Sequence, residues 1–126
     1  MPDKDALIAA VDRYTKAFGD RAGYLACFAP DATVEDPVGS PVRRGLEAIG
    51  QFWDDQHGLA DDVRLERTGP VRVAAGEVAF PMQAVVTMGG ADMVLPIIDV
   101  MTFDDEARIT SMRAYFDMGD LAPHEP

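Results

Sequence analysis

The feature that most constrains the fold is a pair of long strand patterns, residues 77–88 and 91–103, separated by Gly89-Gly90. Paired glycines between two such patterns favour a tight hairpin, because glycine readily adopts the positive φ angles that hairpin turns require. Between residues 94 and 103 both alternating parities are apolar, so one layer of helices cannot cover both faces of this strand. We therefore expect a long antiparallel hairpin with apolar residues on both faces.

The part of the chain before this hairpin is mainly helical in pattern, with apolar residues every three or four positions. It predicts helices over residues 3–19, about 20–29 and about 45–57, and a short strand over 32–36. Shorter strand patterns flank the hairpin at residues 63–67, 71–73 and about 108–116. The order is helices first and then an antiparallel meander, which is typical of α+β domains.

Two prolines, Pro81 and Pro96, lie inside the strand patterns. Proline lacks the N–H that a sheet requires, so it indicates bulges or edges, which help to curve a sheet into a cone. A chain of 126 residues has the size of one domain. We expect a single domain over residues 1–126, with a curved antiparallel sheet and three helices from the N-terminal half packed on its concave face.

The net charge of -11 argues against several classes of partner. An acidic surface repels phosphate backbones and anionic lipids, so neither nucleic acid nor membrane is an expected partner. The basic residues are scattered, apart from Arg43-Arg44, so a strongly anionic substrate is disfavoured as well. The charged first twenty residues and the single cysteine, Cys27, lead us to expect a cytoplasmic protein.

The inventory of reactive side chains excludes several chemistries. The two histidines, His57 and His124, are far apart, and one cysteine cannot complete a metal cluster with them. The two serines lie in no nucleophile motif, and no glycine-rich phosphate loop is present. We expect no metal and no cofactor. The side chains that remain available for catalysis are carboxylates and tyrosines, set in an apolar interior.

Asp99 lies in an apolar strand pattern, so its carboxyl group faces hydrophobic neighbours whichever way it points. An isolated buried carboxylate is costly to ionise, and a neutral carboxylic acid is a hydrogen-bond donor. The strand alone leaves two interpretations open: a neutral donor, or a structural acid paired with an arginine or a backbone group.

Asp36 shares a strand face with Val34, which indicates that it points inward, and Pro37 holds it in an extended conformation. It is either a functional acid or a turn aspartate before proline. Tyr14 lies on the inward stripe of the first helix. It is either a functional hydroxyl or a core tyrosine bonded to a convenient acceptor.

Aromatic residues and methionines at strand spacing are normally core residues. On a concave sheet, one such face can instead line a cavity for a bulky, rigid, apolar ligand, which methionine accommodates well. The side chains that we expect to contact such a ligand are Phe52, Trp53, Phe80, Met82, Met101, Met112, Ala114 and Phe116.

Several separated segments resemble the ketosteroid isomerase family. Residues 31–40 (DATVEDPVGS) are similar to the segment that carries its catalytic base, and Arg13-Tyr14 to the segment with its oxyanion tyrosine. Residues 96–103 (PIIDVMTF) resemble the strand with its second oxyanion donor, and residues 66–72 and 111–116 also resemble family segments. The motifs agree in order and in approximate spacing nearly from end to end.

The resemblance implies a nuclear-transport-factor-like fold, a homodimer, no cofactor and a small apolar steroid as substrate. It implies conversion of 3-oxo-Δ5-steroids to 3-oxo-Δ4-steroids through a dienolate. Asp36 would move the proton, while Tyr14 and a protonated Asp99 would donate hydrogen bonds to the dienolate oxygen. This family is itself a standard example of a carboxylic acid that stays neutral near pH 7.

Three departures and two alternatives accompany the resemblance. Phe28 supplies no hydroxyl at a network position seen in some members, and the stretch between Tyr14 and Asp36 is about two residues shorter than in known members. Trp53 stands where many members have a tyrosine, and an indole can donate a hydrogen bond but cannot accept one. The alternatives are another enzyme of the superfamily, such as a polyketide cyclase or a dehydratase-like protein, and a non-catalytic protein that binds apolar ligands. The superfamily enzymes often use a pocket histidine, whereas the histidines here lie at a helix end and in the C-terminal tail.

Overall fold

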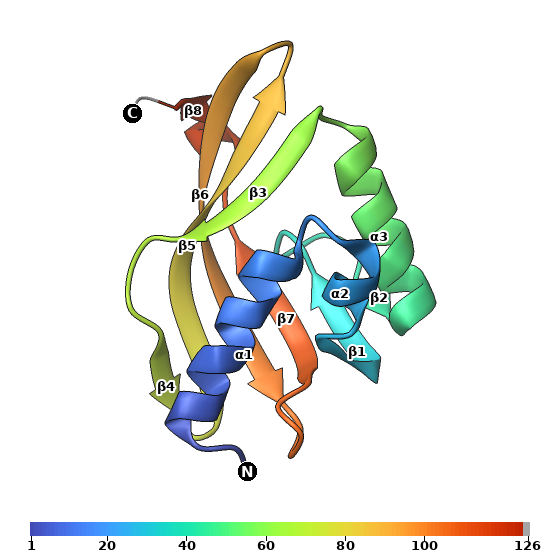
Figure 1. The fold of residues 1–126 in the computed structure, drawn as a ribbon, viewed down its shortest axis with the longest axis vertical. Helices are drawn as coiled ribbons and strands as arrows, with labels where there is room; N and C mark the ends of the chain where they lie inside the picture. The colour runs from blue at the N-terminus through green and yellow to red at the C-terminus, as the bar shows by residue number, and fades with distance from the viewer. Residues whose placement is uncertain (125–126) are drawn as a thin grey trace.

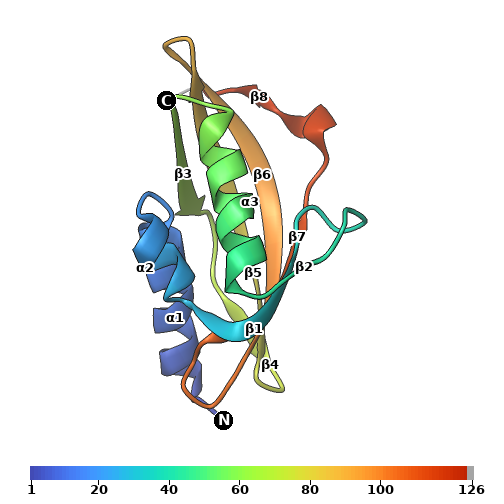
Figure 2. The ribbon, with the colours of Figure 1, turned by 90° about the vertical axis from the view of Figure 1, so that its right-hand side faces the viewer.

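The computed structural model describes residues 1–124, and in it three helices lie on one side of a curved, eight-stranded sheet (Figure 1; Figure 2). This arrangement confirms the predicted α+β cone with helices on its concave face. The helices are α1 (Lys4–Ala17), α2 (Arg21–Leu25) and α3 (Leu46–Gly58), followed late in the chain by a 3-10 turn, η1 (Met118–Asp120). The strands are β1 (Phe28–Glu35), β2 (Arg43–Arg44), β3 (Asp62–Arg67), β4 (Arg72–Ala74), β5 (Glu77–Met88), β6 (Ala91–Phe103), β7 (Ile109–Tyr115) and β8 (Ala122–Pro123).

The predicted β5–β6 hairpin is confirmed, both in its turn and in the pairing of its strands. Gly89 and Gly90 have φ angles of 60° and 81°, which is the left-handed pair that a tight hairpin turn needs. Pairing continues without a shift from Val78↔Met101 to Met88↔Ala91, so neither proline causes a bulge. Pro81 lies where β3 ends and Pro96 lies beyond the reach of β7, so both occupy strand segments that approach an open edge.

The sheet runs β2-β1-β7-β6-β5-β3, and one of its pairs differs from the antiparallel expectation. β1 and β7 are parallel, with Glu35 opposite Arg113. A parallel pair needs a long crossover, which here consists of α3 and the strands β3 to β6. The sheet is therefore mixed.

The segment around Phe28 also differs from the prediction. The helix expected over residues 20–29 ends at Leu25, and β1 begins at Phe28 rather than at residue 32. Phe28 pairs with Ile109 of β7, and the Ile109 amide donates to the Cys27 carbonyl at 2.8 Å. These contacts join residues about 80 positions apart, so local periodicity did not reveal them.

Capping and packing fix the helices that cover the sheet. Asp3 caps α1 by accepting a hydrogen bond from the Ala6 amide at 2.8 Å, and Asp20 caps α2 in the same way. The inward face of α1 contributes Val11 and Tyr14 to the core, while α3 contributes Phe52. The covered half of the sheet therefore forms a packed core.

Candidate active site

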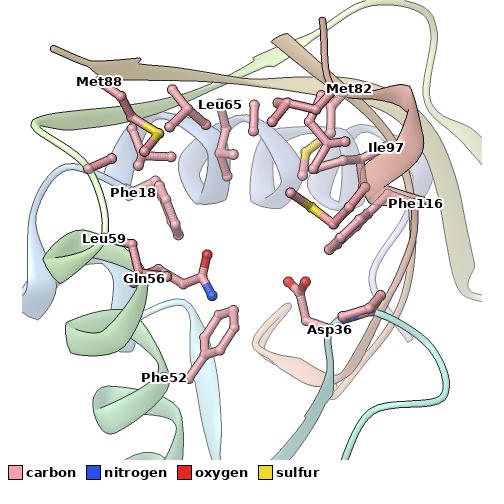
Figure 3. Close-up of a pocket in the computed structure, with 18 of the residues that line it drawn as sticks. Phe18, Asp36, Phe52, Gln56, Leu59, Leu65, Met82, Met88, Ile97 and Phe116 are labelled. Carbon is pink, nitrogen blue, oxygen red and sulfur yellow. The ribbon is translucent and has the colours of Figure 1, made fainter. Parts of the chain in front are cut away.

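An apolar cavity of about 560 Å³ lies between the helices and the uncovered part of the sheet (Figure 3). Its rim carries three exposed side chains, from the C-terminal end of α3, from β5 and from η1: Leu59, Met88 and Met118. Among the described residues that line the cavity, three side chains have polar atoms, namely Tyr14, Asp36 and Gln56. A cavity of this size with few polar groups suits a rigid apolar ligand that carries a small number of oxygen atoms.

Asp36 follows directly after β1, and its carboxylate points into the cavity (Figure 3). The preceding Glu35 is held by Arg113 at 2.9 Å and by the Gly39 amide at 3.0 Å. Because side chains alternate along a strand, this anchoring of Glu35 directs Asp36 toward the opposite, inner side. Burial raises the pKa of Asp36 to about 6, and the positive charge of Arg43 opposes this shift.

Asp99 is completely buried in β6, between Phe80 of β5 and Ala114 of β7. Neither neighbour offers a polar side chain, and within residues 1–124 neither carboxyl oxygen of Asp99 has a hydrogen-bond partner. Burial raises the pKa of Asp99 well above its usual value, and the nearby charge of Asp36 raises it further. These surroundings favour the protonated form of Asp99, in which a carboxyl group can donate a hydrogen bond.

The sheet register brings the two acids into one row. Asp99 is opposite Ala114. Asp36 is one position past Glu35↔Arg113, where β1–β7 pairing ends, so it aligns with Ala114 as well. The Val38 amide donates to the Ala114 carbonyl at 2.8 Å and holds this alignment. Two strand spacings separate the acids by about 10 Å of backbone, and only the small side chain of Ala114 stands between them.

Tyr14 reaches the same region from α1 and lines the cavity. Burial raises the pKa of Tyr14 well above 10, and the nearby groups Tyr24, Asp99 and Asp36 add to the shift. The Tyr14 hydroxyl in turn lowers the pKa of Asp99, which indicates that the two groups are close. The structure thus places Tyr14 and Asp36, which are far apart in the sequence, on one cavity, whereas Asp99 is fully buried and is not among the residues that line it.

The predicted ligand contacts divide into two groups. Phe52, Met82 and Phe116 line the cavity. The other five do not line it: Trp53, Phe80, Met101, Met112 and Ala114. Met101 and Met112 pair with each other one row beyond Asp99, where the sheet belongs to the packed core. Strand spacing identified the correct face of the sheet, but it could not show where along that face the core ends and the cavity begins.

Trp53 has a structural role of its own. Its Nε1 atom donates to the Phe18 carbonyl at 2.9 Å, and its ring stacks on His57 with 3.7 Å between centroids. These contacts join the C-terminal ends of α3 and α1 beside the cavity. The side chain therefore connects two helices, in keeping with an indole that can only donate.

Three further residues were not singled out by the sequence. The Gln56 side chain lies in the cavity, although a glutamine in an amphipathic helix usually indicates a solvent-facing position. Tyr24 is fully buried with its ring 5.6 Å from that of Tyr14, and in the described chain its hydroxyl has no hydrogen-bond partner. Arg43 lies over the ring of Phe52 at 4.8 Å. No sequence pattern around Arg43 indicated that its side chain would lie beside the cavity.

Two other properties of the described residues bear on the chemistry. Within residues 1–124, no group of three or more histidine, cysteine, aspartate or glutamate side chains is arranged to hold a metal ion. The same part of the chain has no helix that combines the length and the apolar composition needed to cross a bilayer. Neither histidine is among the residues that line the cavity.

Comparison with known proteins agrees with this geometry. The cone and its cavity define a SnoaL-like domain, and residues 6–112 match the family model of that name. A steroid Delta-isomerase of Nocardioides simplex is 43% identical over 115 residues, which cover 90% of this chain and 91% of the relative. The chain belongs to the ketosteroid isomerase family within the SnoaL-like domains. This confirms the family predicted from the sequence, and with it an enzyme of the steroid-isomerase type.

A solved structure shares the architecture with a different chemistry. It is described as the epoxide hydrolase/cyclase-like enzyme SalBIII, with a role in pyran ring formation in the polyether salinomycin. It superposes with a TM-score of 0.88 and 26% sequence identity, covering 98% of this chain and all of the other. The fold thus serves more than one reaction, so the reaction has to be argued from the side chains of the site.

Proposed function

We propose that this protein converts 3-oxo-Δ5-steroids to 3-oxo-Δ4-steroids by intramolecular proton transfer through a dienolate. The observation that carries the proposal is one apolar cavity that is lined by the Asp36 carboxyl group and the Tyr14 hydroxyl, with the Asp99 carboxyl group buried in the strand beside it. Moving a double bond into conjugation with a ketone requires one base and the stabilisation of one developing oxyanion. No electron acceptor or external nucleophile enters the balance of this reaction.

Asp36 is the base in this proposal. Its carboxylate removes a proton from C4 of the substrate, the electrons of that C–H bond form the dienolate, and the protonated Asp36 returns the proton to C6. A pKa of about 6 suits both steps, since the group is ionised at neutral pH yet still basic enough to accept a proton. Its orientation into the cavity supports this role (Figure 3).

Tyr14 and Asp99 are the proposed oxyanion donors. Both keep their protons because burial raises the pKa of each group. Donors fixed in advance, where negative charge develops and water is excluded, stabilise a transition state by about 2–4 kcal/mol each. Asp99 lies just behind the cavity surface, since Ile97 lines the cavity two positions earlier on the same face of β6.

The test is formation of the conjugated enone. Purified protein is mixed with a 3-oxo-Δ5-steroid, and the ultraviolet absorbance of the Δ4-enone is followed against a protein-free control. The proposal expects catalysed conversion with multiple turnovers. A folded protein that binds the steroid without converting it would instead be a binding protein, which is the non-catalytic alternative.

A cyclase-like or epoxide-opening activity is the second candidate, and it has an observation of its own. The structural neighbour is 26% identical across nearly the whole chain, and a neutral acid beside a carboxylate could also protonate an epoxide oxygen and activate a nucleophile. Parallel incubation with an epoxy alcohol and with the 3-oxo-Δ5-steroid distinguishes the two reactions. We expect turnover of the steroid alone.

We also infer that the protein acts as a homodimer. The outer face of the sheet carries Ile98 and Tyr115 opposite each other in the β6–β7 register, at 48% and 42% exposure. Paired apolar side chains of this kind on a sheet face are a suitable surface for a second copy. A cytoplasmic location is our expectation, and the free Cys27 thiol is compatible with a reducing compartment.

A further inference from the structure

The amide of Gln56 is the cavity's one polar group, among the described lining residues, that the proposed reaction does not use. Gln56 lies on the face of α3 that also presents Phe52 to the cavity, and its side chain extends into the space that Asp36 faces from the other side (Figure 3). Every other side chain around it on the cavity wall of α3 is apolar. Gln56 is half-buried, so its amide has lost part of its contact with water, and a hydrogen bond to a ligand would compensate for this loss.

Neighbouring polar side chains of α3 are already engaged within the protein. Gln51 donates to Asp55 at 2.9 Å, the Trp53 indole donates to the Phe18 carbonyl at 2.9 Å, and His57 Nδ1 is 2.9 Å from the Trp53 carbonyl. In the described part of the chain the Gln56 amide takes part in no such bond. Its donor and acceptor atoms are therefore available to a ligand.

The position of Gln56 along α3 indicates which part of a ligand it would meet. Four residues of helix correspond to about 6 Å, so Gln56 is about 6 Å beyond Phe52 in the direction of the rim residue Leu59. Gln56 therefore stands between Phe52 and the rim on the α3 wall, and its amide faces the cavity from the side opposite Asp36 (Figure 3). An amide can donate to a carbonyl or hydroxyl and can accept from a hydroxyl.

We propose that Gln56 is a specificity residue that hydrogen-bonds a second oxygen substituent on the substrate, carried by ring B, C or D of a 3-oxo-steroid. This inference rests on the proposed steroid isomerase function and narrows its substrate class to steroids oxygenated outside ring A. The residue selects among substrates and takes no part in the proton transfer itself.

The test measures equilibrium binding, so that it does not depend on turnover. The ligands are a 3-oxo-Δ4-steroid with no other oxygen and three analogues with one added hydroxyl or carbonyl on ring B, C or D. Dissociation constants are compared for the wild type, Gln56→Leu and the matched control Gln51→Leu, which changes the same residue type on the exposed side of α3. Circular dichroism checks that each variant is folded.

The proposal expects one oxygenated analogue to bind Gln56→Leu roughly 3- to 10-fold more weakly than it binds the wild type, the range of one neutral hydrogen bond. The unsubstituted steroid should bind Gln56→Leu as tightly as the wild type or more tightly, and Gln51→Leu should change nothing. An equal change for all four ligands, or no change for any, would overturn the role of Gln56 while leaving the isomerase proposal intact. A wild type that binds none of the four would overturn both, a result that the enone assay identifies separately.

Discussion

Asp36 and Asp99 are the same residue type, but their surroundings raise their pKa values to different extents. Asp36 faces a cavity that is open at its rim and has a cation nearby, so burial raises its pKa only to about 6. Asp99 is completely buried and, within the described residues, has no hydrogen-bond partner, so its pKa is raised well above the usual value although Tyr14 lowers it in part. The proposed roles, Asp36 as base and Asp99 as donor, rest on this difference in environment.

A series of substitutions at Asp99 separates a catalytic donor from a structural acid. Asparagine can still donate one hydrogen bond from nearly the same place, whereas leucine cannot. We expect Asp99→Asn to lose modest activity and Asp99→Leu to lose about 2–4 kcal/mol of barrier stabilisation, in folded protein. The measurement is kcat beside the thermal midpoint for both variants. Equal activity losses that follow equal stability losses would mean that Asp99 is structural.

The pKa of Asp36 also predicts how stability depends on pH. Its folded-state pKa of about 6 exceeds the ordinary 3.8, so between these values the folded protein retains a proton that the unfolded chain releases. The contribution of Asp36 to the free energy of unfolding is therefore present below pH 3.8 and is lost as pH rises through 6. Asp36→Asn should be more stable than the wild type at pH 7, by up to about 3 kcal/mol, and not at pH 3.

Chemical denaturation of both proteins at several pH values checks this prediction. The quantity to compare is the difference between variant and wild type, because Glu35 and Asp104, whose pKa values are lowered, give the opposite pH dependence in both proteins. A difference that does not grow between pH 4 and pH 6 would show that the Asp36 carboxyl is not desolvated.

At the scale of elements, the two-residue strand β2 brings a cation to the site. Arg43 pairs with Val34 of β1, two positions before Asp36, and its guanidinium lies over the Phe52 ring at 4.8 Å. Its charge lowers the pKa of Asp36 against the effect of burial. Through Arg43, β2 therefore contacts the Phe52 ring of the cavity wall and acts electrostatically on Asp36.

Removing this charge should make the base harder to ionise. The pKa of about 6 for Asp36 leads us to expect the acid limb of the wild-type kcat/KM profile near pH 6, and we expect Arg43→Met to move this limb to higher pH. Arg44→Met is the matched control, because Arg44 is the exposed neighbour on the same strand. A limb that stays in place, or moves to lower pH, in Arg43→Met would rule out this role of β2.

Elements with a local signal could be predicted from the sequence, and elements defined by distant contacts could not. The β5–β6 hairpin was predicted to the residue because Gly89-Gly90 and the long strand patterns are local features. The start of β1 depends on pairing between Phe28 and Ile109, and β2 is too short to have a periodicity. Loop-closing contacts of this kind are decided by the tertiary structure.

The residues of the candidate site also divide into those that a local sequence pattern predicts and those that only the tertiary structure reveals. Tyr14, Asp36 and Asp99 could be proposed because acids and a tyrosine on apolar faces are conspicuous, and because their motifs resemble a known family. Gln56 could not be found in this way, since a polar residue on a helix normally faces solvent. The boundary between cavity and core depends on where the helices stop covering the sheet, which no single strand pattern records.

At the scale of the whole molecule, the helices pack on the concave face of the sheet, and a strip of exposed apolar side chains lies on its outer face. The outer strip is centred on Ile98 and Tyr115, and the Arg113 side chain donates to the Tyr115 hydroxyl at 2.9 Å at its margin. The helices lie on the opposite face of the sheet (Figure 2). The cavity is on that same face, since Ile97 lines it while Ile98 points outward, so in a homodimer formed through this strip the two cavities would lie away from the interface.

A charge placed on the strip should separate the two copies. We expect sedimentation to give about twice the chain mass of 13.6 kDa for the wild type and the mass of one chain for Ile98→Glu. Val42→Glu, at another exposed apolar position, is the matched control and should remain dimeric. A wild type that sediments as a monomer at micromolar concentration would contradict the dimer.

The claim on which the whole account depends is that one carboxylate, Asp36, carries the proton. Its most direct test is kcat of Asp36→Asn on a 3-oxo-Δ5-steroid, beside the dissociation constant for the Δ4 product. Asparagine keeps the size of the side chain and removes its basicity, so kcat should fall by roughly 10²–10⁴-fold while product affinity stays within a few fold of the wild type. Turnover near the wild-type rate in this variant would contradict the account.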